Sequence, residues 1–150
     1  MKLYSFKYFN TITPVREYSI LYKKLNFKNS YPADVMRLKI IKSLLEKYNP
    51  KKIIDAGCGA GMPLITLKKA GFNIKGYDKA ENMIKEAKIN LKQNKLSTDL
   101  AFIDNFEKPN KLKKNSVDCI LGMGAFYYSK NFEATIKNQR QILKKNGRLI

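Results

Sequence analysis

Apolar side chains recur along the chain at two spacings, and these predict an alternation of helices and strands. After Pro32 they recur every three or four residues as far as Asn49-Pro50, which predicts a helix. The same spacing predicts further helices over 62–70, 81–95 and 133–145. Short apolar runs between them predict five strands, over 51–56, 73–78, 99–104, 117–124 and from 148 to the end.

This order predicts one α/β domain. Strands that alternate with helices form a mostly parallel sheet with right-handed crossovers and helices on both faces, which makes three layers. The length of 150 residues suits a single domain of this kind. Ligands of such sheets bind at the carboxyl ends of the strands. The loop after the first strand is therefore where we expect the chemistry.

That loop belongs to the segment I-I-D-A-G-C-G-A-G at 53–61. Its glycines have the spacing G-x-G-x-G, at Gly57, Gly59 and Gly61. A dinucleotide fingerprint would need its third glycine at position 62, which is Met. Asp55 at the strand end would repel a phosphate, whereas it suits a ligand that carries an ammonium or a sulfonium. The alternative is a tight turn that only packs the strand on the next helix.

The segment resembles the first motif of the class I S-adenosylmethionine-dependent methyltransferases, and the resemblance covers about residues 35–150. It implies a Rossmann-like sheet of strand order 3-2-1-4-5 and S-adenosylmethionine as the cofactor. It also implies that the cofactor is held by the loop residues Asp55, Gly57, Cys58, Gly59 and Gly61.

Two later strand ends extend the resemblance. It implies that Asp78 binds the ribose hydroxyls; the alternative is a cap on the helix that begins near Glu81. Lys79 stands where the family usually has an apolar residue against adenine. Asp104 matches the acidic residue that contacts the adenine amine, and Asn105 would supply a backbone donor; the alternative for Asp104 is a turn.

The segment V-D-C-I-L-G-M-G-A-F-Y-Y at 117–128 resembles the fourth family motif and adds Gly122 to the cofactor-binding set. It lacks the Asn/Asp-Pro-Pro-Tyr/Phe of enzymes that methylate amino groups of bases. Tyr127 and Tyr128 are the best-placed residues to orient an acceptor, with apolar packing as the alternative. Arg37 either pairs with the cofactor carboxylate or is an exposed helical residue.

Composition narrows the chemistry. The chain has no His, which removes Ser-His-Asp and Cys-His catalysis and imidazole acid–base chemistry. Cys58 and Cys119 lie far apart, so we expect neither a disulfide scaffold nor a metal site. The net charge of +18 comes from 30 basic and 12 acidic residues. Only four of the basic residues are Arg and the lysines are scattered, so nucleic acid is a possible but not a favoured partner.

We therefore expect a methyltransferase that acts on a small-molecule acceptor. The alternatives are an RNA methyltransferase, supported by the charge, and a non-catalytic cofactor-binding or scaffold protein. No apolar stretch is long enough for a bilayer or typical of a signal peptide, so we expect a cytoplasmic protein without membrane partners. The sequence does not determine an oligomeric state.

Residues 1–32 hold five of the nine tyrosines and predict an aromatic-rich cap or lid, while 33–150 form the cofactor-binding core. The family's sheet has seven strands, and the last two form a hairpin. We expect these two strands to be missing here, because the chain stops inside its fifth strand. A parallel edge left open is a liability, so the alternative is a short form whose edge another chain covers.

Overall fold

The computed structural model describes residues 32–150, so the expected aromatic cap lies outside the described residues except at its last position. The described chain forms a five-stranded sheet in the order β3-β2-β1-β4-β5, as predicted, with every neighbouring pair parallel. The strands are β1 Ile53–Ala56, β2 Ile74–Asp78, β3 Ala101–Ile103, β4 Val117–Leu121 and β5 Leu143–Leu149.

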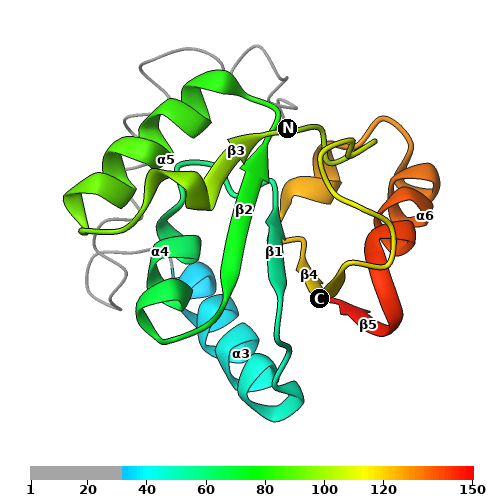
Figure 1. The fold of residues 1–150 in the computed structure, drawn as a ribbon, viewed down its shortest axis with the longest axis horizontal. Coiled ribbons are helices and arrows are strands. Elements are labelled where there is room, and N and C mark those ends of the chain that lie inside the picture. The colour runs from blue at the N-terminus through cyan, green and yellow to red at the C-terminus, as the bar shows by residue number, and fades with distance from the viewer. Residues whose placement is uncertain (1–31) are drawn as a thin grey trace.

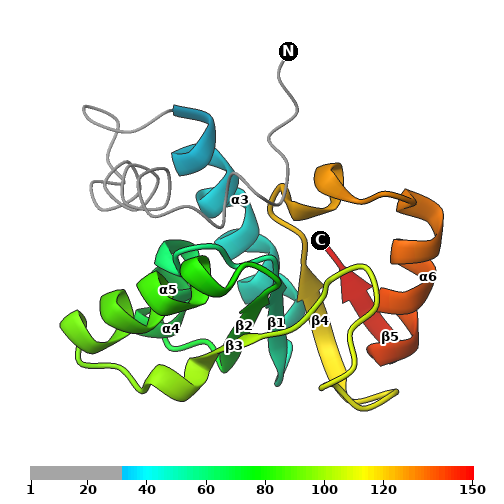
Figure 2. The same cartoon turned by 90° about the horizontal axis from the view of Figure 1, so that it is seen from above.

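Helices cover both faces of this sheet. They are α3 Pro32–Tyr48, α4 Met62–Lys69, α5 Glu81–Gln93 and α6 Phe132–Ile142, with short 3₁₀ turns η1 Thr98–Leu100 and η2 Ala125–Tyr128. Helices α3, α4 and α5 lie together on one face, and α6 lies on the other (Figures 1 and 2). Among these helices none is both long and apolar enough to cross a membrane.

Alternating side chains of the central strands build the two halves of the core. On β1, Ile53 packs in a cluster with Leu45 and Leu64 from the helices of one face. Its neighbour Ile54 points the other way, into a cluster that contains Ile142. Because both faces are covered, β1 is buried at every position. This burial fixes the position of the loop that follows the strand relative to the rest of the sheet.

The end of α6 differs from the prediction. The helical spacing predicts a helix over 133–145, but α6 ends at Ile142 and β5 begins at the next residue. Leu143 is only 4% exposed and pairs with Val117 on β4, and pairing then resumes at Cys119 and Arg148 after a break in register. Burial of Leu143 against the sheet therefore ends the helix, and the residues between bulge outward.

Strands β3 and β4 are each three residues shorter than predicted, and β1 and β2 start two residues and one residue later than predicted. Strand β4 ends at Leu121 rather than at 124, since the chain turns at Gly124, which has a φ of +94°. Strand β3 starts at Ala101, because Ser97 Oγ accepts the N–H of Asp99 and starts a 3₁₀ turn there. These turns belong to the loops at the two ends of the sheet.

Candidate active site

The glycine loop after β1 is fixed to the neighbouring strand β2. The N–H groups of Gly57 and Cys58 both donate to the carbonyl of Tyr77, at 2.8 and 2.9 Å. Gly61 then closes the loop, with its N–H on the carbonyl of Cys58 at 3.0 Å. These three bonds join backbone atoms only, and a further bond from the Gly59 N–H goes to the side chain of Asp78.

Gly57 is the tightest point of this loop. Its φ of +78° is strained for any residue with a side chain. A Cβ at this position would overlap the Cβ of Ala125, which follows β4. The backbone of the loop at Gly57 therefore lies against the side chain of Ala125, and only glycine at position 57 leaves room for this contact.

Asp55 lies at the floor of a cavity beside this loop. The side chain is 1% exposed, and neither carboxylate oxygen has a hydrogen-bond partner within residues 32–150. Burial, and secondarily the charge of Asp78, raises its pKa from 3.8 to about 7. A buried carboxyl group without partners is costly. It is suited to a cation that enters from outside the chain.

Asp78 ends β2 and joins three backbone segments. Its Oδ2 accepts the N–H of Gly59 at 3.0 Å, and its Oδ1 accepts the N–H of Ala80 at 2.9 Å, just before α5. Burial raises its pKa, against the opposing effect of these hydrogen bonds. Oδ1 thus orders the turn into α5, but α5 has no side-chain cap at its N-cap residue Ala80, so the helix-cap alternative is met only in this looser form. Each oxygen keeps a further lone pair for a ligand hydroxyl.

Asp104 is turned into its own loop. The carboxylate is 5% exposed and accepts N–H groups of Asn105 at 2.8 Å, Asn110 at 3.2 Å and Lys111 at 3.0 Å. The turn alternative accounts for all of these contacts. The Asn105 N–H, expected to serve the cofactor, is thus used by Asp104 itself. The adenine contact of these two residues stays a prediction.

Lys79 and Gly122, both predicted as cofactor-binding, have contacts within the protein. Lys79 Nζ lies 3.8 Å from Glu107 and 4.9 Å from the centre of the Phe106 ring. A Cβ on Gly122 would overlap the Phe126 ring, so this glycine makes room for an aromatic side chain. Both residues thus have packing roles within the protein. Ligand contacts by them stay predictions.

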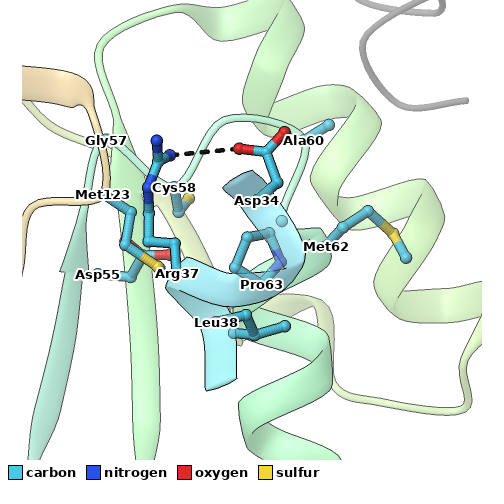
Figure 3. A pocket seen from close by; sticks show the side chains of 11 residues that line it. Asp34, Arg37, Leu38, Asp55, Gly57, Cys58, Ala60, Met62, Pro63 and Met123 are labelled. Atoms are coloured by element: carbon cyan, nitrogen blue, oxygen red, sulfur yellow. Dashed lines mark ion pairs between the residues drawn. The ribbon is translucent and has the colours of Figure 1, made fainter. Parts of the chain in front are cut away.

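Helix α3 covers the mouth of the site. Asp34, Arg37 and Leu38 line the cavity with the loop residues and with Met123 from the end of β4. Arg37 Nη1 lies 3.4 Å from Asp34 Oδ1, and Figure 3 shows both side chains extending from α3 beside the glycine loop. Sequence analysis did not find Asp34, because an acidic residue in the first turn of a helix is ordinary.

Tyr127 and Tyr128 lie on the 3₁₀ turn η2 after β4. Their side chains are 59% and 36% exposed, and the two rings meet edge to face with centres 5.5 Å apart. The turn starts at Ala125, which touches the glycine loop, so η2 borders the site. Neither tyrosine lines the cavity of Asp55. The packing alternative is weakened by their exposure, and the acceptor role stays a prediction.

The cavity itself is small, with a volume of about 30 Å³. That is enough for a water molecule and far too little for a nucleoside. The segment after β4 lies directly on Gly57 and limits this space. Within residues 32–150 no group of three or more His, Cys, Asp or Glu side chains could hold a metal ion.

Comparison with known proteins identifies the family. Residues 48–150 match the model of a methyltransferase domain. A ubiquinone biosynthesis O-methyltransferase of Pelagibacter ubique is 33% identical over 97 residues, which are 64% of this chain and 39% of that protein. An uncharacterized protein of Haemophilus influenzae is 29% identical over 133 residues, 87% of this chain and 52% of that one. The chain thus spans about half or less of these curated relatives.

Solved structures agree on the fold. One is a protein of Methanococcus maripaludis described as an S-adenosyl-L-methionine-dependent methyltransferase. It matches this chain with a TM-score of 0.75 at 19% sequence identity, and the matched region is 99% of this chain and 64% of that protein. A SAM-dependent methyltransferase of Thermotoga maritima matches this chain with a TM-score of 0.66 at 24% sequence identity. The matched region is 90% of this chain and 56% of that protein.

Proposed function

The chain belongs to the class I methyltransferase family, and on that premise we propose that it transfers a methyl group from S-adenosylmethionine to a small-molecule acceptor. The observation that carries the proposal is the buried, unpartnered carboxyl group of Asp55 beside the glycine loop. A ligand with a cationic amino acid part would give this group the partner that the described residues lack. NAD and ATP carry phosphates there, which the same carboxylate would repel.

Three further residues fit the rest of the cofactor. Asp78 keeps lone pairs for the two ribose hydroxyls while its bonds to Gly59 and Ala80 hold it in place. Arg37, at the mouth of the cavity, is the cation that would take the carboxylate of the amino acid part. Arg37 would then loosen its 3.4 Å contact with Asp34. This ion pair is weak because the Arg37 side chain is 45% exposed to water.

The chemistry is a displacement at carbon. S-adenosylmethionine supplies an electrophilic methyl group on a positively charged sulfur. Transfer of this methyl group would also require the acceptor to lose a proton to water or to a neighbouring base. The residues of this chain contribute position and exclusion of water. Tyr127 and Tyr128 are the side chains that we assign to orienting the acceptor.

We infer that the segment after β4 moves away from the glycine loop to admit the amino acid part of the cofactor, because the cavity beside Asp55 has a volume of only about 30 Å³. Gly122 and Gly124 flank Met123 in this segment and allow such a change in backbone angles. The lining chemistry fits the cofactor even though the space is narrow.

Calorimetry tests the cofactor assignment. S-adenosylhomocysteine should bind, and NAD and ATP should not; tight binding of NAD alone would refute the proposal. The acceptor needs a separate experiment, in which the protein and cofactor with a labelled methyl group are incubated with a metabolite extract and with total RNA. Label in a small molecule supports the proposal. Label in RNA supports the RNA methyltransferase alternative, and binding without transfer to either pool supports a non-catalytic protein.

A further inference from the structure

A second cavity lies at the end of the sheet opposite to the glycine loop. It has a volume of about 360 Å³, within the range of small-molecule sites. Its walls come from the end of α3, the residues before β1 and the outward bulge of β5. The cofactor site at the carboxyl ends uses none of its residues.

Cations dominate the rim of this groove. They are Lys51, Lys144, Lys145 and Arg148, against the single acidic residue Asp118. Lys144 Nζ lies 2.7 Å from Asp118 Oδ1, and Oδ2 of the same carboxylate accepts the N–H of Lys52 at 2.8 Å. The hydrogen bond from Lys144 holds the pKa of Asp118 below its usual range. Lys51, Lys145 and Arg148 have no carboxylate partner in the part of the chain that the structure describes.

Arg148 is positioned for recognition rather than left free in solvent. Its guanidinium carbon lies 4.0 Å from the centre of the Tyr48 ring, on which it is held by a cation–π contact. This contact uses the face of the guanidinium and leaves its N–H donors at the edge. None of the described residues accepts a hydrogen bond from them. An anion with several oxygens can accept hydrogen bonds from these N–H donors at little cost in side-chain entropy, because the guanidinium is already held in place.

The floor of the groove is apolar. Leu45 is fully buried, and burial raises the pKa of the Cys119 thiol to about 11, so the thiol is uncharged. Ile150 and Pro50 complete this surface. A ligand here would place an uncharged body on the floor and its negative charge at the rim.

We propose that this groove binds a phosphate ester. A phosphate carries up to two negative charges and three acceptor oxygens, which can meet the three cations without partners, whereas a carboxylate carries one charge and two oxygens. This count describes a phosphate monoester, as in a free nucleotide such as AMP; a phosphodiester of the RNA backbone carries one charge and two terminal oxygens and serves as the comparison in the test. The proposal is independent of the methyl-transfer proposal, since the two sites share no residue.

The test is a titration of the 150-residue chain with AMP, with a short single-stranded RNA and with citrate. Arg148→Gln should weaken AMP or RNA binding about tenfold or more, and Arg148→Lys nearly as much, because it keeps the charge and loses the fork. Lys88→Gln, at an exposed position of α5, also removes one positive charge and should change binding less than about twofold. Binding of S-adenosylhomocysteine should stay unchanged in all three variants, which separates this result from failure of the cofactor site.

Binding of AMP supports the proposal, whereas binding of RNA without AMP would overturn it in favour of the nucleic acid backbone. Equal losses in Arg148→Gln and Lys88→Gln would overturn the proposal, because they would reveal general charge attraction only. Citrate binding as tight as AMP, or no binding of either phosphate probe, would overturn it as well. Thermal melts of each variant confirm that a loss does not come from unfolding.

Discussion

Gly59 donates its backbone N–H to Asp78 Oδ2 at 3.0 Å, and this hydrogen bond joins the glycine loop to the end of β2. Asp78 Oδ1 accepts the N–H of Ala80 at 2.9 Å and so also fixes the start of α5. One carboxylate therefore orders both segments that border the proposed cofactor site. A substitution there affects the fold and the ligand together, and the two effects must be measured separately.

Asp78→Ala removes both hydrogen bonds and the proposed ribose contact. We expect a loss of about 1–3 kcal/mol in the free energy of unfolding and a ten- to hundredfold weaker affinity for S-adenosylhomocysteine. Asp78→Asn keeps one acceptor oxygen, so its loss of stability should be small, whereas its loss of affinity for S-adenosylhomocysteine should be larger. Urea unfolding and calorimetry on both variants provide the measurement. An unchanged dissociation constant in a folded Asp78→Asn protein would limit Asp78 to the helix cap and the loop.

Asp55→Asn should stabilise the unliganded protein in a pH-dependent way. The pKa of Asp55 is raised to about 7 in the folded state, from 3.8. Its contribution to stability is therefore complete below about pH 4 and is lost as the pH rises through about 7. The neutral amide avoids this loss, so its advantage should grow with pH to at most roughly 4 kcal/mol.

Urea unfolding of the wild type and of Asp55→Asn at pH 5 and pH 8 measures this difference. The same variant should bind S-adenosylhomocysteine less tightly, because the carboxylate no longer meets a cation. A stability difference that is equal at both pH values would contradict the buried titration of Asp55.

Gly57→Ala combines backbone strain with a collision against Ala125. A left-handed residue with a Cβ costs about 1–2 kcal/mol, and the overlap adds to this. Gly71→Ala is the matched control, because Gly71 has a φ of +94° with nothing within 4 Å of the new Cβ. The double variant Gly57→Ala/Ala125→Gly should regain part of the loss. Thermal melts of the three variants measure this, and equal losses at Gly57 and Gly71 would rule out the collision.

Asp104→Ala distinguishes the two roles of this residue. If its carboxylate serves the loop alone, the variant should lose about 2–3 kcal/mol of stability, since several N–H groups lose a charged acceptor. Affinity for S-adenosylhomocysteine, measured well below the melting temperature, should then change less than about threefold. Asp99→Ala, at an exposed position, is the control. A large loss of affinity in a folded Asp104→Ala protein would instead support the adenine contact.

Local signals in the sequence determined much of the fold. The spacing of apolar residues placed α3 between Pro32 and Tyr48 and located the first four strands, while β5 begins five residues before its predicted start. The glycine spacing identified the loop after β1, and the acidic residue at its start pointed to a cation. These features could be predicted because helix periodicity, strand burial and glycine turns depend on neighbours in the chain.

The tertiary structure decided what depends on distant neighbours. Leu143 leaves the helical pattern because β4 offers it a buried pairing partner. Asp104 turns toward backbone N–H groups up to seven residues away, which no strand pattern reveals. Asp34 and Arg37 reach the site only because α3 packs beside the glycine loop. The sequence thus indicated which residues are candidates for chemistry, while packing determined which of their atoms already have partners in the protein and which are left for a ligand.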